Sequence, residues 1–203
     1  MCALRSVLET IVGIAHSSRM QRMMSVFLIL AFTFGVTPAS ADQTDPRLDN
    51  LFEILQSSDE SLEIRAAESL IWAAWTHHEN PEYQQMMRMG TRAMDGGLYD
   101  QAIGIFSSLI EKAPDFAEAW NKRATVYFLT GDLSLSVEDV ARTLELEPRH
   151  FGALSGLGQI ELLRGNGEAA LRAFQGALEA HPHLPGIGAL VRKLNDEVRG
   201  REL

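Results

Sequence analysis

One interval of 34 residues recurs along the second half of this chain and restricts the folds open to it. Four columns of similar residues keep the interval: prolines, glycines, small residues and large apolar residues. Their members are Pro114, Pro148 and Pro182; Gly97, Gly131 and Gly165; Ala102, Ser136 and Ala170; and Phe106, Val140 and Phe174. A fixed period of this length is typical of stacked supersecondary units, each of which buries its apolar face against its neighbours.

Each column has a physical meaning in a helical hairpin. The glycine is suited to the left-handed residue that ends a helix, and the proline stops the second helix because it cannot continue one. The small residue lets two antiparallel helices approach, and the large apolar residue fills the space between units. Apolar residues on both sides of Gly131 recur mostly at three- and four-residue spacing, which predicts two helices. Asp115 followed by Glu118 predicts a capping box at the start of the first of them.

With units starting at Tyr83, Ala117 and Phe151, the sequence resembles tetratricopeptide repeat proteins, whose unit has 34 residues and a W…L-G…Y…A…F…A…P pattern. The matching residues are Met86, Met89, Gly90, Ala102, Phe106 and Pro114; Trp120, Ala124, Tyr127 and Pro148; and Leu154, Leu157, Gly158, Ala170, Phe174, Ala177 and Pro182. Departures are Arg123 at a leucine position, and Ala93 and Glu161 at the aromatic position. The resemblance implies an all-α, right-handed α-solenoid of helix-turn-helix repeats.

The repeats divide the chain into consecutive segments. We expect a signal peptide over 1–41, a flexible lead-in over 42–46, a degenerate helical-hairpin repeat over 47–82, three repeats over 83–116, 117–150 and 151–184, and a capping helix over 185–203. Atypical end units are expected in repeat arrays because one of their faces meets water.

The N-terminal segment has the order of features found in secretory signals. Arg19 and Arg22 precede an apolar run of twelve residues, 25–36, and Ala39-Ser40-Ala41 follows as an A-x-A cleavage site. The run is shorter than the ~20 residues that a membrane-spanning helix needs, although an uncleaved anchor remains the alternative. Translation could start between Met20 and Met24. The prediction is an exported chain, periplasmic or secreted, without a stable membrane span after cleavage.

Composition and motifs restrict the classes of partner and of reaction that we expect for this chain. A net charge of −9 argues against nucleic acid, and the single cysteine, Cys2, rules out a disulfide or CxxC site. Neither an HExxH sequence nor a nucleophile elbow occurs, so we expect no catalysis, metal or cofactor. The methionines at 86, 87, 89 and 94 are better explained as core filling than as copper ligands.

The first helix of each repeat is expected to line a concave binding surface. Projecting unit positions 5, 9 and 12 inward, together with a neighbouring lysine, predicts these peptide-binding residues: Met87, Thr91, Asn121, Lys122, Thr125, Phe128, Ser155 and Gln159. Some tetratricopeptide domains hold acidic C-termini in a clamp of basic residues and asparagine. The nearest basic residues here, Arg88, Lys122 and Arg123, do not reproduce the full clamp.

Two functions remain open. The first is a protein- or peptide-binding scaffold that uses the concave face. The second is a self-associating module in which exposed end faces stack into a homodimer, with Trp72 and Trp75 as candidate contact residues.

Overall fold

The computed structural model describes residues 43 and 45–199, and the predicted signal peptide lies outside them. Regular structure in this part of the chain is helical throughout. The helices are α3 (Arg47–Ser57), α4 (Ser61–Thr76), α5 (Pro81–Asp95), α6 (Tyr99–Lys112), α7 (Ala117–Thr130), α8 (Leu133–Leu146), α9 (Phe151–Leu163), α10 (Gly167–Ala180) and α11 (Ile187–Arg199). None of the described helices is long and apolar enough to cross a lipid bilayer.

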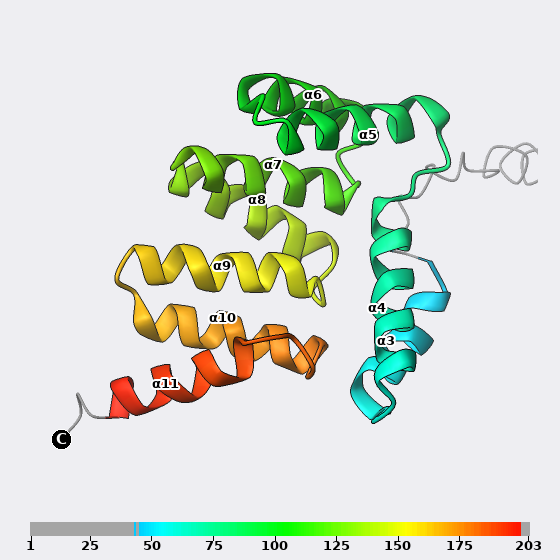
Figure 1. Cartoon of the computed structure of the whole chain (residues 1–203). Coiled ribbons are helices and arrows are strands. Elements are labelled where there is room, and N and C mark those ends of the chain that lie inside the picture. Colours follow the sequence, from blue (N-terminus) through cyan, green and yellow to red (C-terminus); the bar gives the residue numbers. More distant parts are fainter. Residues whose placement is uncertain (1–42, 44, 200–203) are drawn as a thin grey trace, which may run out of the picture. The chain divides into compact units, whose positions relative to one another are not determined.

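Helices α5 to α10 form three antiparallel hairpins stacked side by side, and α11 covers the last of them (Figure 1). The turn inside each hairpin contains one glycine with a positive φ: 72° at Gly97, 87° at Gly131 and 77° at Gly165. A left-handed residue at a helix end is accessible to glycine without a steric cost. This confirms the all-α tetratricopeptide-type solenoid that the 34-residue interval predicts.

Glycine and phenylalanine pair where the two helices of a hairpin cross. A Cβ added to Gly90 would lie 2.5 Å from the ring of Phe106, and one added to Gly158 would lie 2.5 Å from the ring of Phe174. The middle repeat has Ala124 and Val140 at these positions, both buried. Phenylalanine on the second helix of a hairpin therefore faces glycine on the first, and the smaller valine faces the larger alanine.

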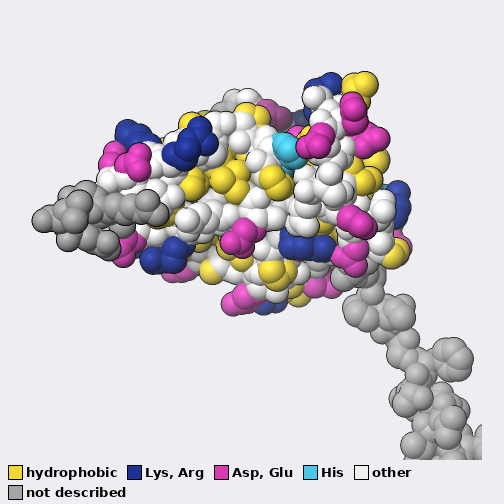
Figure 2. All heavy atoms as spheres, turned by 90° about the horizontal axis from the view of Figure 1, so that it is seen from below, with side chains coloured by type: hydrophobic (Ala, Val, Ile, Leu, Met, Phe, Trp, Pro, Cys, Tyr) yellow, Lys and Arg dark blue, Asp and Glu magenta, His cyan; other side chains and the backbone are white. Residues whose placement is uncertain are grey.

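Helix α11 packs its apolar face against the last hairpin and caps the array. Leu194 is buried against α10, and Ile187, Leu190 and Val191 pack around it. Figure 2 views the molecule from this side and shows Lys, Arg, Asp and Glu side chains interspersed among the apolar ones. The end of the array is therefore a capped, mixed surface rather than one continuous apolar patch.

The α3–α4 hairpin does not stack as a further repeat. Figure 1 shows α4 running across the ends of α7 and α9, and the core under the hairpin includes Phe151 of α9 and Ala180 at the end of α10. Trp75 is 1% exposed, so the proposal that it lies on an outer contact face is wrong. Trp72 is partly buried and packs against the same core. Residues 47–82 do contain the predicted helical hairpin, but it covers an edge of the array.

Candidate functional site

A hollow of about 270 Å³ lies between α7 and α9. Side chains of α7 form one wall, α9 between Gly152 and Ile160 forms the other, and Ser136 and Val140 of α8 lie between them. The α9 wall includes Gly156, beside which a Cβ would meet no atom within 4 Å, so the backbone of this helix is accessible there.

A second hollow of about 330 Å³ lies beside α5. Its lining comes from the end of α4, from α5 and from α7, and consists of Thr76, Gln84, Met87, Arg88, Thr91, Arg92 and Lys122. Gln84 joins two of these elements: its Nε2 donates to the carbonyl of Thr76 over 3.2 Å, and its Oε1 accepts from the backbone N–H of His78 over 2.7 Å. The three cationic side chains give this hollow a positive character.

The predicted binding residues fall into these two hollows, with one exception. Asn121, Thr125, Phe128 and Gln159 line the first, and Met87, Thr91 and Lys122 line the second. Ser155 lines neither of them, and its Oγ is buried without a hydrogen bond in the described structure. Contact of these residues with a ligand remains a prediction.

Arg123 faces away from both hollows. Its guanidinium makes two hydrogen bonds to the carboxylate of Asp139, of 2.7 and 2.8 Å, and one of 2.9 Å to Ser107. The pair therefore replaces the apolar contact that leucine makes at this position of the repeat. The side chain links α7 to α6 and α8 and takes no part in the candidate site.

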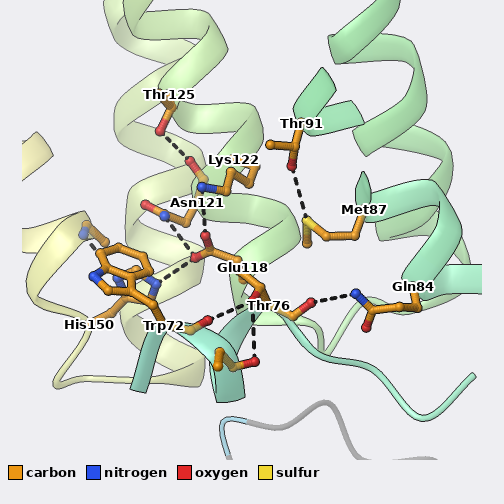
Figure 3. A network of polar contacts seen from close by, with 12 residues as sticks. Trp72, Thr76, Gln84, Met87, Thr91, Glu118, Asn121, Lys122, Thr125 and His150 are labelled. Atoms are coloured by element: carbon orange, nitrogen blue, oxygen red, sulfur yellow. Dashed lines mark hydrogen bonds and ion pairs between the residues drawn. The ribbon is translucent and has the colours of Figure 1, made fainter. Parts of the chain in front are cut away.

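The two hollows together form a groove along α5, α7 and α9. A buried carboxylate supports the groove side chains of α7 (Figure 3). Glu118 is 0% exposed. Its Oε2 accepts from Asn121 Nδ2 over 2.9 Å and lies 2.8 Å from His150 Nε2, and its Oε1 lies 3.1 Å from Lys122 Nζ. This side chain therefore connects two of the predicted binding residues, Asn121 and Lys122.

His150 joins this network to the edge hairpin. Its Nδ1 accepts from the backbone N–H of Ala153 over 3.1 Å and caps α9. Because that nitrogen is an acceptor, the ring proton is on Nε2, which donates to Glu118. Trp75 of α4 stacks on the imidazole with 4.0 Å between ring centroids and 12° between planes. The α3–α4 hairpin thus covers the imidazole that donates to the carboxylate.

Burial alone would raise the pKa of Glu118, because it disfavours the charged form. The charge of Lys122 and the hydrogen bonds from His150 and Asn121 outweigh that effect and lower the pKa below its ordinary value. Glu118 is therefore an anion held in place by two partners on α7 and one at the N-cap of α9.

Sequence reasoning misassigned Glu118 and missed the part played by His150. Residue Phe116 is the N-cap of α7 and has no side-chain cap, so the predicted capping box of Asp115 and Glu118 is not formed. Glu118 turns inward instead. The only sequence signal was an acidic residue one turn before Asn121 and Lys122 on the same helix, and its partner His150 lies 32 residues away.

Comparison with known proteins agrees with the fold. The profile of the tetratricopeptide repeat matches residues 87–142 and 131–185. A TPR repeat-containing protein of Rhizobium etli is 28% identical over 179 residues, which cover 81% of this chain and 88% of that protein. Hsp70-Hsp90 organizing protein 3 of Arabidopsis thaliana is 26% identical over 106 residues, and the match spans 50% of this chain and 19% of that protein.

Solved structures show the same architecture at low identity. The first TPR of Spaghetti (RPAP3), bound to an HSP90 peptide, superposes with a TM-score of 0.55 at 20% identity, covering 58% of this chain and 93% of that one. The Sgt2 TPR domain from Aspergillus fumigatus gives 0.56 at 20% identity, covering 61% and 83%. The profile matches over residues 87–142 and 131–185 and the Rhizobium relative, together with the repeat glycines and prolines, show that the chain belongs to the tetratricopeptide repeat family.

Proposed function

We propose that this chain is a non-catalytic protein-binding scaffold that holds an extended segment of a partner protein against α5, α7 and α9. The observation that carries the proposal is the placement of the groove residues. Two hollows lie on either side of the adjacent residues Asn121 and Lys122, so a segment crossing α7 would contact both. Stacked helix pairs generally bind extended chains on such surfaces.

The two ends of the groove differ in charge. The hollow beside α5 is lined by Arg88, Arg92 and Lys122, whereas the lining of the α7–α9 hollow contains no charged side chain. A partner segment with acidic residues at the α5 end and uncharged residues over α9 fits this distribution. The likeness to the Spaghetti domain, which was solved with the HSP90 peptide SRMEEVD, supports a peptide as ligand.

Residues 1–41 place this scaffold, in our proposal, in the periplasm or outside the cell. The support is the order of positive charge, apolar run and A-x-A site in the sequence. Fractionation of cells that express the chain, followed by N-terminal sequencing, tests it. A mature N-terminus at Asp42 in the exported fraction is expected, and an unprocessed cytoplasmic protein would contradict export.

Site-specific photo-crosslinking in cells tests the groove. A photoreactive residue replaces Gln159, which lines the α7–α9 hollow, and in a matched control it replaces Glu145, an exposed residue of α8 outside both hollows. We expect a discrete crosslinked partner from position 159 that is absent from position 145. Equal crosslinking at both positions would show that the groove is not the binding surface.

Self-association remains a second candidate function, because α4 is apolar on its outer face as well. Leu62 and Leu70 are 75% and 51% exposed, and Ala66 and Ala73 are exposed between and beyond them. Large exposed apolar residues can mark an interaction surface. Light scattering of the wild type and of a Leu62→Glu, Leu70→Glu variant tests it: a dimer that the substitutions dissociate supports this function, and a monomer at all concentrations removes it.

A further inference from the structure

The amide group of Asn121 has a fixed orientation. The side chain is 8% exposed, and its Nδ2 donates to Glu118. An ionised carboxylate only accepts hydrogen bonds, so the amide nitrogen must face Glu118 and Oδ1 must point the other way, as Figure 3 shows. Asn121 lines the α7–α9 hollow, and Oδ1 receives no hydrogen bond from residues 45–199.

Thr125 provides a second acceptor one helical turn further along α7. Its hydroxyl donates to the backbone carbonyl of Asn121 over 2.9 Å. The proton of the hydroxyl is thus used within the helix, and the lone pairs of Oγ1 remain available. Thr125 lines the same hollow as Asn121.

The spacing of the two acceptors matches one kind of ligand backbone. Side chains at i and i+4 of a helix lie about 5–6 Å apart at Cβ. In an extended chain, every second N–H points the same way, and at about 3.4 Å per residue these groups recur every ~6.8 Å. The small difference lies within the range of lengths and angles that hydrogen bonds accept.

The opposite wall allows a backbone to come close. Gly156 of α9 lines this hollow without a side chain, and a Cβ built on it would meet no atom within 4 Å, whereas one built on Gly152 would lie 2.6 Å from the ring of Trp72. An α-helix would not use the two acceptors, because its N–H groups beyond the first four are bonded internally.

We propose that Asn121 Oδ1 and Thr125 Oγ1 accept hydrogen bonds from two backbone N–H groups, two residues apart, in an extended partner segment, and that Glu118 is the positioning residue that fixes the first acceptor. The proposal rests on the proposed function and specifies its ligand chemistry. It makes the α3–α4 hairpin a brace for the site, because Trp75 covers His150 and His150 holds Glu118. Acceptors fixed before binding lose little entropy when the partner arrives.

The test uses a short peptide selected for binding to the full chain from a random displayed library. The selected peptide must crosslink through a photoreactive residue at position 159. Each backbone N–H of the peptide is then replaced in turn by N–CH₃, and a parallel alanine scan reports on its side chains. We expect two N-methyl positions, two residues apart, to weaken binding by about tenfold each, the size of one lost hydrogen bond.

Variants of the protein assign each position. In Thr125→Val, which keeps the shape of the side chain, one of the two N-methyl positions should no longer matter. In Glu118→Gln, the new amide can donate to Oδ1 and release the orientation of Asn121, so the other position should lose its effect. Glu161→Gln is the matched control: Glu161 is also a buried carboxylate bonded to an asparagine, Asn166, but it lies outside the hollow. It should change neither position.

The outcomes separate this inference from the proposed function. A peptide that crosslinks at position 159 but tolerates N-methylation at every position, or loses binding only through its side chains, overturns the inference and leaves the scaffold intact. Two sensitive positions that Thr125→Val and Glu118→Gln both leave unchanged overturn it as well. Failure to select any peptide that crosslinks at position 159 removes the groove as a peptide site and the inference with it. Circular dichroism of each variant verifies that the helices remain folded.

Discussion

The α3–α4 hairpin and the α9–α10 hairpin are both pairs of antiparallel helices, yet only the second belongs to the stack. At the crossing of α9 and α10, Gly158 receives the ring of Phe174, so the helices approach closely and present a regular face to their neighbours. In the edge hairpin, Trp72 and Trp75 project from α4 and pack on Phe151 and His150. The two hairpins therefore differ in the volume of the side chains at their contacts: a glycine admits the partner helix in the stacked one, and two indoles occupy the contact in the edge one.

The largest effect should come from removing the aromatic anchor of the edge hairpin. Trp75→Ala deletes a fully buried indole and should lower the free energy of unfolding by about 3–5 kcal/mol, as measured by urea denaturation. Trp120→Ala in the stacked region is the control, because Trp120 is only partly buried and should cost less. Equal losses would show that the edge hairpin is not held by this core.

A smaller effect is expected where the middle repeat departs from its neighbours. Arg123→Leu restores the usual residue but leaves the carboxylate of Asp139, which is 4% exposed, without its partner, and should cost about 3 kcal/mol. Adding Asp139→Ala reproduces the pair found 34 residues later, Leu157 and Ala173, and should recover most of the loss. A double variant less stable than Arg123→Leu alone would contradict this reading of the ion pair.

Two glycines of α9 sharpen the comparison at a single helix crossing. Gly158→Ala would place a Cβ 2.5 Å from the ring of Phe174 and should destabilise the chain by about 1–3 kcal/mol. Gly156→Ala meets open space and should stabilise by up to ~1 kcal/mol through helix propensity. Thermal unfolding of the two variants should shift in opposite directions, and a common direction would show that the close approach does not determine the packing.

The smallest effect is expected from pH, at the contact between the edge hairpin and the stack. Burial lowers the pKa of His181 below 6.5, and the attraction of Glu68 on α4 only partly opposes it. The unfolded chain therefore binds the proton more readily, so stability is complete above pH 6.5 and declines as the pH falls from there towards the lower folded value.

The Glu118 carboxylate, whose pKa is also lowered, adds a second decline below the unfolded value of 4.5. Urea unfolding between pH 7 and pH 5 should reveal the first decline, and His181→Gln should reduce it. A profile that stays flat over this range in the wild type would exclude His181 as its source.

Much of the groove could be found from the sequence, because its residues follow the repeat. Helices α7 and α9 begin at Ala117 and Phe151, the residues at which two repeat units were predicted to start. Positions 5, 9 and 12 of a helix with 3.6 residues per turn then share one face, which brought Asn121 and Thr125 to one hollow. Ser155 lies outside both hollows, with its hydroxyl buried, and its contact with a ligand stays a prediction.

The residues that hold the groove side chains in place could not be found from the repeat pattern. The contact of Glu118 with His150, and that of His150 with Trp75, join residues 32 and 75 positions apart in the sequence. No periodic pattern connects them. In the sequence, a buried carboxylate with three partners cannot be told from any other acidic residue in the first turn of a helix. Such residues are common there because a negative charge interacts favourably with the helix dipole.

The sequence by itself determined the hairpins, their length and the face that each turns towards the groove, because glycine, proline and apolar spacing act locally, within one or two helical turns. Only the tertiary structure decided where the α3–α4 hairpin lies and which way the amide of Asn121 points. Both depend on the fit of Trp72 and Trp75 to distant helix ends and on the charges that meet there, and such contacts exist only once the chain has folded.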